Sequence, residues 1–94
     1  MVRESEIERM VSQAVTTAGG LSFKFVSPGN DGVPDRIFIL PGGRVIFAEL
    51  KTESGRLSPV QEHQISRIRK TGCDCRVIKG KAKAEAFICE ICAT

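Results

Sequence analysis

The sequence has no Trp and no Tyr, a single His and no long apolar run. Five Phe residues are therefore the whole aromatic inventory, which leaves little for stacking on unpaired bases, so any binding of nucleic acid would depend mainly on phosphates and shape. Charges interrupt the first 20 residues every few positions, and no apolar run approaches the roughly 18 residues of a membrane span. We expect neither an export signal nor a membrane anchor.

The chain is short, with 94 residues, and its charge is nearly balanced. A hydrophobic fraction of 41% with 27% charged residues is typical of a globular protein and excludes a disordered or fibrous one. This length suffices for one core, so we expect a single domain over residues 1–94. The net charge of +3 permits an anionic partner without requiring one.

Apolar periodicity predicts seven elements in the order α-β-β-β-α-β-α. Helices are expected over residues 4–18 and 59–71 and near the C-terminus, where apolar residues recur over 84–91. Strands are expected over 21–26, 36–40, 44–50 and 75–79. The two central strands are apolar on both faces and are joined by Pro41-Gly42-Gly43, which predicts a hairpin packed on both sides. The fold class is α/β, a mixed sheet flanked by helices.

Two acidic residues come together if this hairpin has a three-residue turn. Asp35 then lies opposite Glu49, and Lys51 follows on the same face. A two-residue turn would shift the register by one residue and separate the carboxylates. Because directly opposed acids repel, a bound cation would stabilise the pair, and oxygen ligands suit Mg²⁺ or Mn²⁺. Such a site with a nearby lysine fits phosphodiester hydrolysis, whereas ordinary charged strand ends are the competing interpretation.

Three motifs then give the sequence a specific resemblance. They are Gly32-Val-Pro-Asp-Arg36, Glu49-Leu-Lys51 and Gly55-Arg-Leu-Ser-Pro-Val-Gln61. Their order and spacing resemble the VRR-NUC (virus-type replication-repair nuclease) family of the PD-(D/E)XK superfamily, which implies a restriction-endonuclease-like core. The resemblance also implies Mg²⁺ or Mn²⁺ held by Asp35 and Glu49, with the backbone carbonyl of Leu50 as a possible ligand, and a Lys51 that assists the attacking water.

The family pattern also includes a glutamate on the first helix and a glutamine on the second. The glutamate matches Glu4, which could act through a water, although Glu8 is also within reach of the sheet edge on a helical wheel. The glutamine matches Gln61, which stands on an apolar helix face and also completes a capping box with Ser58.

The four cysteines and the scattered basic residues are the remaining candidates. Zinc held by Cys73, Cys75, Cys89 and Cys92 is disfavoured, because small buried hydrophobes are the commoner use of such residues. Contacts to DNA phosphates are expected from basic residues on either side of the carboxylates: Lys24, Arg36, Arg56 and Arg76.

We therefore expect a metal-dependent endonuclease for branched DNA, which needs no small-molecule cofactor. Stand-alone relatives of phage and bacterial type resemble Holliday-junction resolvases, and two cuts in a four-way junction imply a homodimer in the cytoplasm of a bacterium or an infected host. Cleavage of flaps, nicks or single strands is the alternative within this class. A zinc-stabilised module that binds nucleic acid without cleaving it is the alternative outside it.

Overall fold

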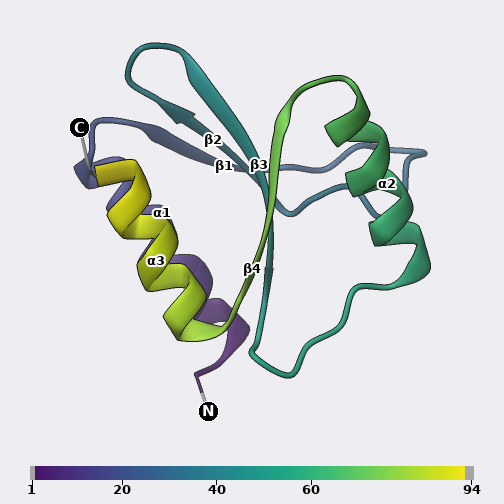
Figure 1. Cartoon of the computed structure of the whole chain (residues 1–94), viewed down its shortest axis with the longest axis horizontal. Coiled ribbons are helices and arrows are strands. Elements are labelled where there is room, and N and C mark those ends of the chain that lie inside the picture. Colours follow the sequence, from purple (N-terminus) through teal and green to yellow (C-terminus); the bar gives the residue numbers. More distant parts are fainter. Residues whose placement is uncertain (1, 93–94) are drawn as a thin grey trace.

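The computed structural model describes residues 2–92, which form a four-stranded sheet with three helices (Figure 1). Strand order in the sheet follows chain order, β1-β2-β3-β4. Neighbouring strands are antiparallel except β3 and β4, which are parallel. The predicted class, element order and mixed sheet are confirmed. In chain order the elements are α1 (Glu4–Thr17), β1 (Leu21–Lys24), β2 (Arg36–Leu40), β3 (Arg44–Lys51), α2 (Pro59–Lys70), β4 (Asp74–Lys79) and α3 (Gly80–Cys92).

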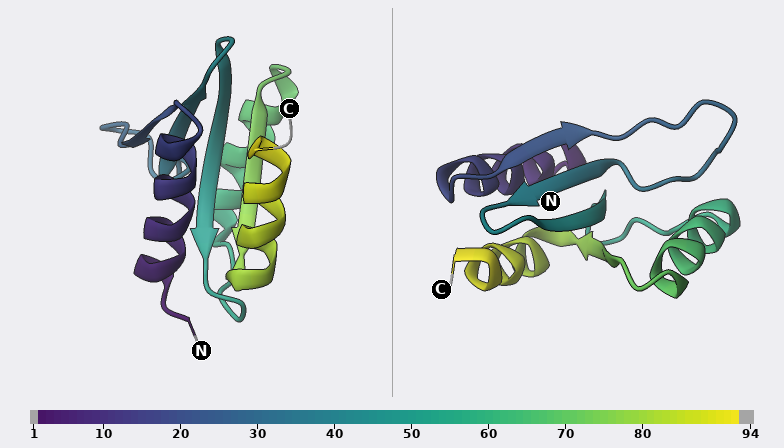
Figure 2. Two further views of the ribbon diagram at one scale, coloured as in Figure 1. Left: turned by 90° about the vertical axis from the view of Figure 1, so that its left-hand side faces the viewer. Right: turned by 90° about the horizontal axis from the view of Figure 1, so that it is seen from above.

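One face of the sheet is covered by α1 and α3, which lie side by side in front of the strands in the left view of Figure 2. Alternate residues of the central hairpin, such as Phe38, Ile46 and Leu50, meet these helices and are fully buried. The rings of Phe38 and Phe87 lie 5.8 Å apart between centroids, which ties α3 to β2. No helix within residues 2–92 is long and apolar enough to cross a membrane.

The turn of the β2–β3 hairpin fixes the register of the sheet. Leu40 pairs with Arg44, and the Gly43 N–H donates to the Leu40 carbonyl at 3.1 Å. Gly42 and Gly43 have φ angles of 87° and 80°, a region that side chains with a Cβ rarely adopt. The expected three-residue turn is confirmed. The same register, carried one step beyond the Arg36–Ala48 pair, sets Asp35 opposite Glu49.

The other face of the sheet is covered only in part. The one helix on this side within residues 2–92 is α2, which packs over β4 with Ile65 buried (Figure 1). Farther from α2, Leu21 is 53%, Phe23 50% and Val45 42% exposed. The hairpin was expected to be packed on both sides. This is confirmed for the face that α1 and α3 cover and only partly for the α2 face, because a helix of 12 residues does not span four strands.

The loop between β1 and β2 is pressed against the start of α2. Gly32 has a φ of +86°, and a Cβ added there would lie 2.5 Å from Val60 Cγ1 and 2.8 Å from the Val60 carbonyl oxygen. Gly29 has a similar φ of +82° but open space around it. The close approach at Gly32 therefore holds the loop, and with it Asp35, against α2.

We expect Gly32→Ala to destabilise the fold more than Gly29→Ala. Both variants would place alanine at a positive φ, at a cost of roughly 1–2 kcal/mol, and only Gly32→Ala adds overpacking against Val60, for roughly 1–3 kcal/mol more. Urea unfolding of both variants measures the difference. Equal losses of stability would contradict the close contact.

Candidate active site

Asp35 and Glu49 are brought together at one end of the hairpin. Asp35 directly precedes β2, and its backbone carbonyl accepts a hydrogen bond from the Phe25 N–H at 2.7 Å. Its side-chain Oδ2 accepts from the Leu50 N–H at 3.3 Å. Glu49 belongs to β3 and is 1% exposed. Two carboxylates are thus held in place by backbone hydrogen bonds and burial.

The environment of Glu49 is unfavourable for a negative charge. Its pKa is raised to about 8, first by burial and then by repulsion from the Asp35 carboxylate, with a smaller contribution from Glu4. Lys51 acts in the opposite direction, since its Nζ lies 3.7 Å from Glu49 Oε2. Glu49 Oε1 is buried and has no hydrogen-bond partner. A cation or a hydrogen-bond donor placed at Glu49 Oε1 would therefore stabilise the site.

Gln61 connects the first turn of α2 to this carboxylate. Its Oε1 accepts from the Ser58 N–H at 2.9 Å, and its backbone N–H donates to Ser58 Oγ at 3.1 Å, which is the predicted capping box. Its Nε2 donates to Glu49 Oε2 at 3.2 Å. One amide side chain thus caps the helix and orients Glu49.

This double contact predicts different outcomes for the two halves of the capping box. Gln61→Ala and Ser58→Ala should each destabilise the protein by about 1 kcal/mol. Only Gln61→Ala should lower the rate of DNA cleavage, by about tenfold, because it also frees Glu49 Oε2. Thermal unfolding and a cleavage assay compare the variants. An equal loss of cleavage in Ser58→Ala would mean that Gln61 acts through helix stability alone.

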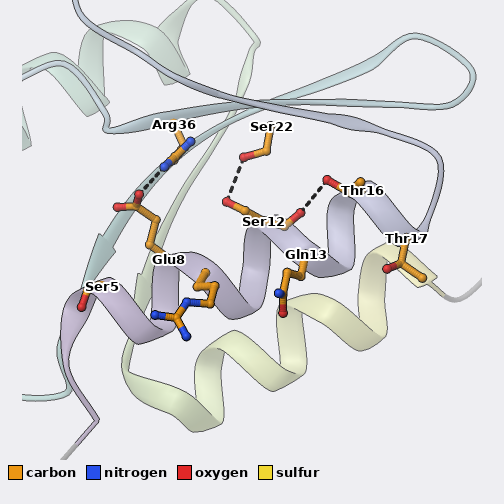
Figure 3. A pocket seen from close by; sticks show the side chains of 9 residues that line it. Ser5, Glu8, Ser12, Gln13, Thr16, Thr17, Ser22 and Arg36 are labelled. Atoms are coloured by element: carbon orange, nitrogen blue, oxygen red, sulfur yellow. Dashed lines mark hydrogen bonds and ion pairs between the residues drawn. The ribbon is translucent and has the colours of Figure 1, made fainter.

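The two glutamates of α1 have different surroundings. Glu4 is close enough to contribute to the raised pKa of Glu49. Glu8 forms an ion pair with Arg36, and Figure 3 shows the two side chains meeting at the edge of a polar groove. Glu4 therefore acts on Glu49 through its charge, whereas Glu8 is paired with Arg36.

The expected basic residues differ in their availability. Lys24 and Arg56 are exposed. Arg36 is paired with Glu8, and Arg76 binds both Asp74, with a shortest contact of 2.5 Å, and Glu90, at 2.7 Å. Because an ion pair competes with a phosphate for the guanidinium, Lys24 and Arg56 are the freer of the four basic residues expected to contact DNA.

The cysteines are not arranged for zinc. Cys75 is buried, whereas Cys73, Cys89 and Cys92 are exposed. Within residues 2–92, no three or more His, Cys, Asp or Glu side chains are grouped so as to hold a metal ion. The structure thus gives no support to a zinc-stabilised module.

A hard divalent cation nevertheless suits the Asp35–Glu49 pair. Mg²⁺ is commonly bound by one or two protein carboxylates, with waters and substrate phosphate completing its ligands, so a cluster of three acidic side chains is not required. The buried oxygen Glu49 Oε1 lacks a partner and faces repulsion from Asp35, both of which a cation would relieve. The donor set therefore fits the group that the sequence predicts.

Sequence reasoning missed two contacts at this site. The backbone N–H of Leu50 binds Asp35, whereas only its carbonyl had been considered, and Phe25 extends the β1–β2 ladder to Asp35. The alternation of Leu21, Phe23 and Phe25 was a signal for the second contact, because it already placed Phe25 on the strand face that Asp35 shares.

Known proteins resemble this chain in sequence and in fold. Residues 3–82 match the family model described as the VRR-NUC domain. A protein named "Putative nuclease p44", from Acyrthosiphon pisum secondary endosymbiont phage 1, is 41% identical over 68 residues, which cover 72% of this chain and 73% of the relative. A solved structure described as a VRR_NUC domain is similar with a TM-score of 0.85 and 27% identity, covering 94% of this chain and 96% of the other. The chain thus belongs to the VRR-NUC family and is a nuclease domain.

Proposed function

We propose that this nuclease hydrolyses phosphodiester bonds of branched DNA with the help of Mg²⁺ or Mn²⁺. The observation that carries the proposal is the Asp35–Glu49 pair, which leaves a buried carboxylate oxygen without a partner beside Lys51. Asp35, Glu49 and the backbone carbonyl of Leu50 would hold the metal. When bound, the metal supplies Lewis acidity toward a phosphate oxygen and toward the attacking water.

The protein groups around the carboxylates would position the reactants. Lys51 lies beside Glu49 and would donate to a phosphate oxygen, which stabilises the negative charge that grows as water attacks phosphorus. Gln61 keeps Glu49 oriented through its Nε2. The reaction forms a bond from the water oxygen to phosphorus and breaks the bond to the leaving sugar oxygen, which takes up a proton.

The groove beside α1 offers the sugar-phosphate backbone a surface that reaches Arg36, the residue that follows Asp35. It has a volume of about 720 Å³ and lies between α1 and β1 (Figure 3). Arginines and hydroxyl side chains are the usual donors to DNA phosphates. The groove is lined by nine residues: Ser5, Glu8, Arg9, Ser12, Gln13, Thr16, Thr17, Ser22 and Arg36.

The cleavage experiment compares labelled four-way junction, flap, nicked duplex and single strand with Mg²⁺, Mn²⁺ or EDTA. We expect cutting only with a divalent metal, and fastest on the four-way junction. Asp35→Asn should abolish cutting, while Asp31→Asn, an exposed residue of the same loop, should not. Cutting in EDTA or full activity of Asp35→Asn would refute the metal site. A preference for flaps, nicks or single strands would refute the junction substrate and leave the nuclease chemistry intact.

A homodimer would supply the two sites that paired cuts require. The proposal is supported by the apolar residues Leu21, Phe23 and Val45, which are about half exposed on the part of the α2 face that α2 does not cover. Exposed apolar patches of this kind commonly mark contacts between proteins. In light scattering after gel filtration, the wild type should have the mass of two chains, and Leu21→Glu that of one. A monomeric wild type would contradict the dimer.

A further inference from the structure

A second pocket lies next to the carboxylates, between α2 and the loop that joins β1 to β2. Its volume is about 410 Å³. Its apolar wall consists of Phe25, Val33, Phe47 and Ile68. Its polar rim consists of Ser27, Asn30, Gln64, Arg67, Thr71 and Cys73. Nothing in the proposed hydrolysis uses this pocket.

The pocket lies two residue pairs along the sheet from the two carboxylates. Phe47 precedes Glu49 by two residues on the same face of β3, a distance of about 7 Å. Phe25 stands beside Asp35, since its N–H donates to the Asp35 carbonyl. A nucleotide whose phosphate lies at the carboxylates would thus have its base within reach of both phenyl rings.

The two rings form an aromatic wall. Their centroids are 5.7 Å apart and their planes meet at 59°. Both residues are half-buried, so part of each ring is open to a ligand. Aromatic side chains of this kind are the usual platform for unpaired bases, whatever the base.

The rim offers polar groups beside this wall. Gln64 donates from Nε2 to the Asp31 carbonyl at 3.1 Å and accepts at Oε1 from Arg67 at 3.2 Å. A guanidinium carries five N–H donors, so the exposed Arg67 retains donors for a base edge or a phosphate.

We propose that this pocket receives one unpaired nucleobase of the strand that is cut, stacked on the ring of Phe25 and tilted against that of Phe47. The proposal rests on the proposed cleavage of DNA and adds a subsite to it. A base held in a duplex cannot enter a recess walled by α2 and a loop, so the pocket would favour nucleotides that a branch point has already unpaired.

The test measures binding of two 12-nucleotide single strands of equal charge, one of thymidines and one of abasic sites. Fluorescence anisotropy of labelled strands in EDTA and low salt avoids cleavage. We expect the thymidine strand to bind the wild type roughly tenfold more tightly, because only it can stack. Phe25→Leu should reduce this preference to roughly twofold and leave the affinity for the abasic strand unchanged. Val26→Ala, at the exposed neighbouring position outside the pocket, should keep the full preference.

Equal affinity of the wild type for both strands, including no measurable binding of either, would overturn the proposal. So would a Val26→Ala effect as large as that of Phe25→Leu. If Phe25→Leu fails to fold, a 2-aminopurine placed in the thymidine strand reports stacking in the wild type, and unchanged fluorescence on binding would also overturn it. Cleavage is scored separately: a wild type that cuts DNA without preferring bases refutes the pocket alone, and one that prefers bases without cutting refutes the proposed hydrolysis.

Discussion

Glu49→Gln should abolish DNA cleavage and at the same time raise the stability of the metal-free protein. Cleavage should fall by at least about a thousandfold, because the variant loses a charged metal ligand. Stability should rise by on the order of 2 kcal/mol, or roughly 10 °C in Tm, because an amide replaces a buried carboxylate that faces Asp35 and has an unpartnered oxygen. Thermal unfolding in EDTA measures the gain.

A gain in stability would show that Glu49→Gln is inactive because it loses a metal ligand and not because it unfolds. Glu85→Gln, an exposed position on α3, should change neither stability nor cleavage and serves as the control. Addition of Mn²⁺ should raise the Tm of the wild type much more than that of Glu49→Gln. A variant that is both inactive and less stable in EDTA would contradict the repulsion inferred between Glu49 and Asp35.

Lys51→Ala should slow cleavage by roughly a hundred- to a thousandfold while leaving metal binding in place. The ammonium lies 3.7 Å from Glu49 Oε2, on the same strand and face, where it would act on the reacting phosphate. The rise in Tm on addition of Mn²⁺ should therefore persist in the variant, in contrast to its loss in Asp35→Asn. Single-turnover cleavage and thermal unfolding with and without Mn²⁺ measure the two effects.

The matched control is Lys79→Ala. Lys79 pairs with Lys51 in the parallel register of β3 and β4, so it has the same charge and stands on the neighbouring strand. We expect its replacement to reduce cleavage less than threefold. Equal losses at both lysines would indicate that the strands supply general positive charge and that Lys51 has no specific role.

The local geometry of the site was predictable because it depends on one register. A turn of three residues fixes every pair of the hairpin, and the apolar pattern of β2 and β3 admits no shift without exposing their buried faces. The position of Asp35 opposite Glu49 follows from that single choice. The capping box was predictable for a similar reason, since it depends on the spacing of Ser58 and Gln61 alone.

The rest of the site depends on long-range packing that periodicity does not encode. A helical wheel places both Glu4 and Glu8 near the sheet edge, and only the packing of α1 on the sheet brings Glu8 to Arg36. The pocket that contains Phe25 and Phe47 requires the loop at Gly32 to meet Val60 of α2. The sequence shows a glycine at position 32, but it does not show that Val60 packs against it.

The hairpin turn at Pro41–Gly43 offers a place where further protein segments can be attached. The turn is at the end of the hairpin farthest from the carboxylates. The Leu40–Arg44 pair at the turn lies four residue pairs along the hairpin from the Arg36–Ala48 pair beside Asp35. Added Cβ atoms at Gly42 and Gly43 would meet nothing within 4 Å. A recognition module inserted between these two strands would project away from the scissile phosphate. An insertion at this turn should therefore leave both the sheet pairing and the two carboxylates undisturbed.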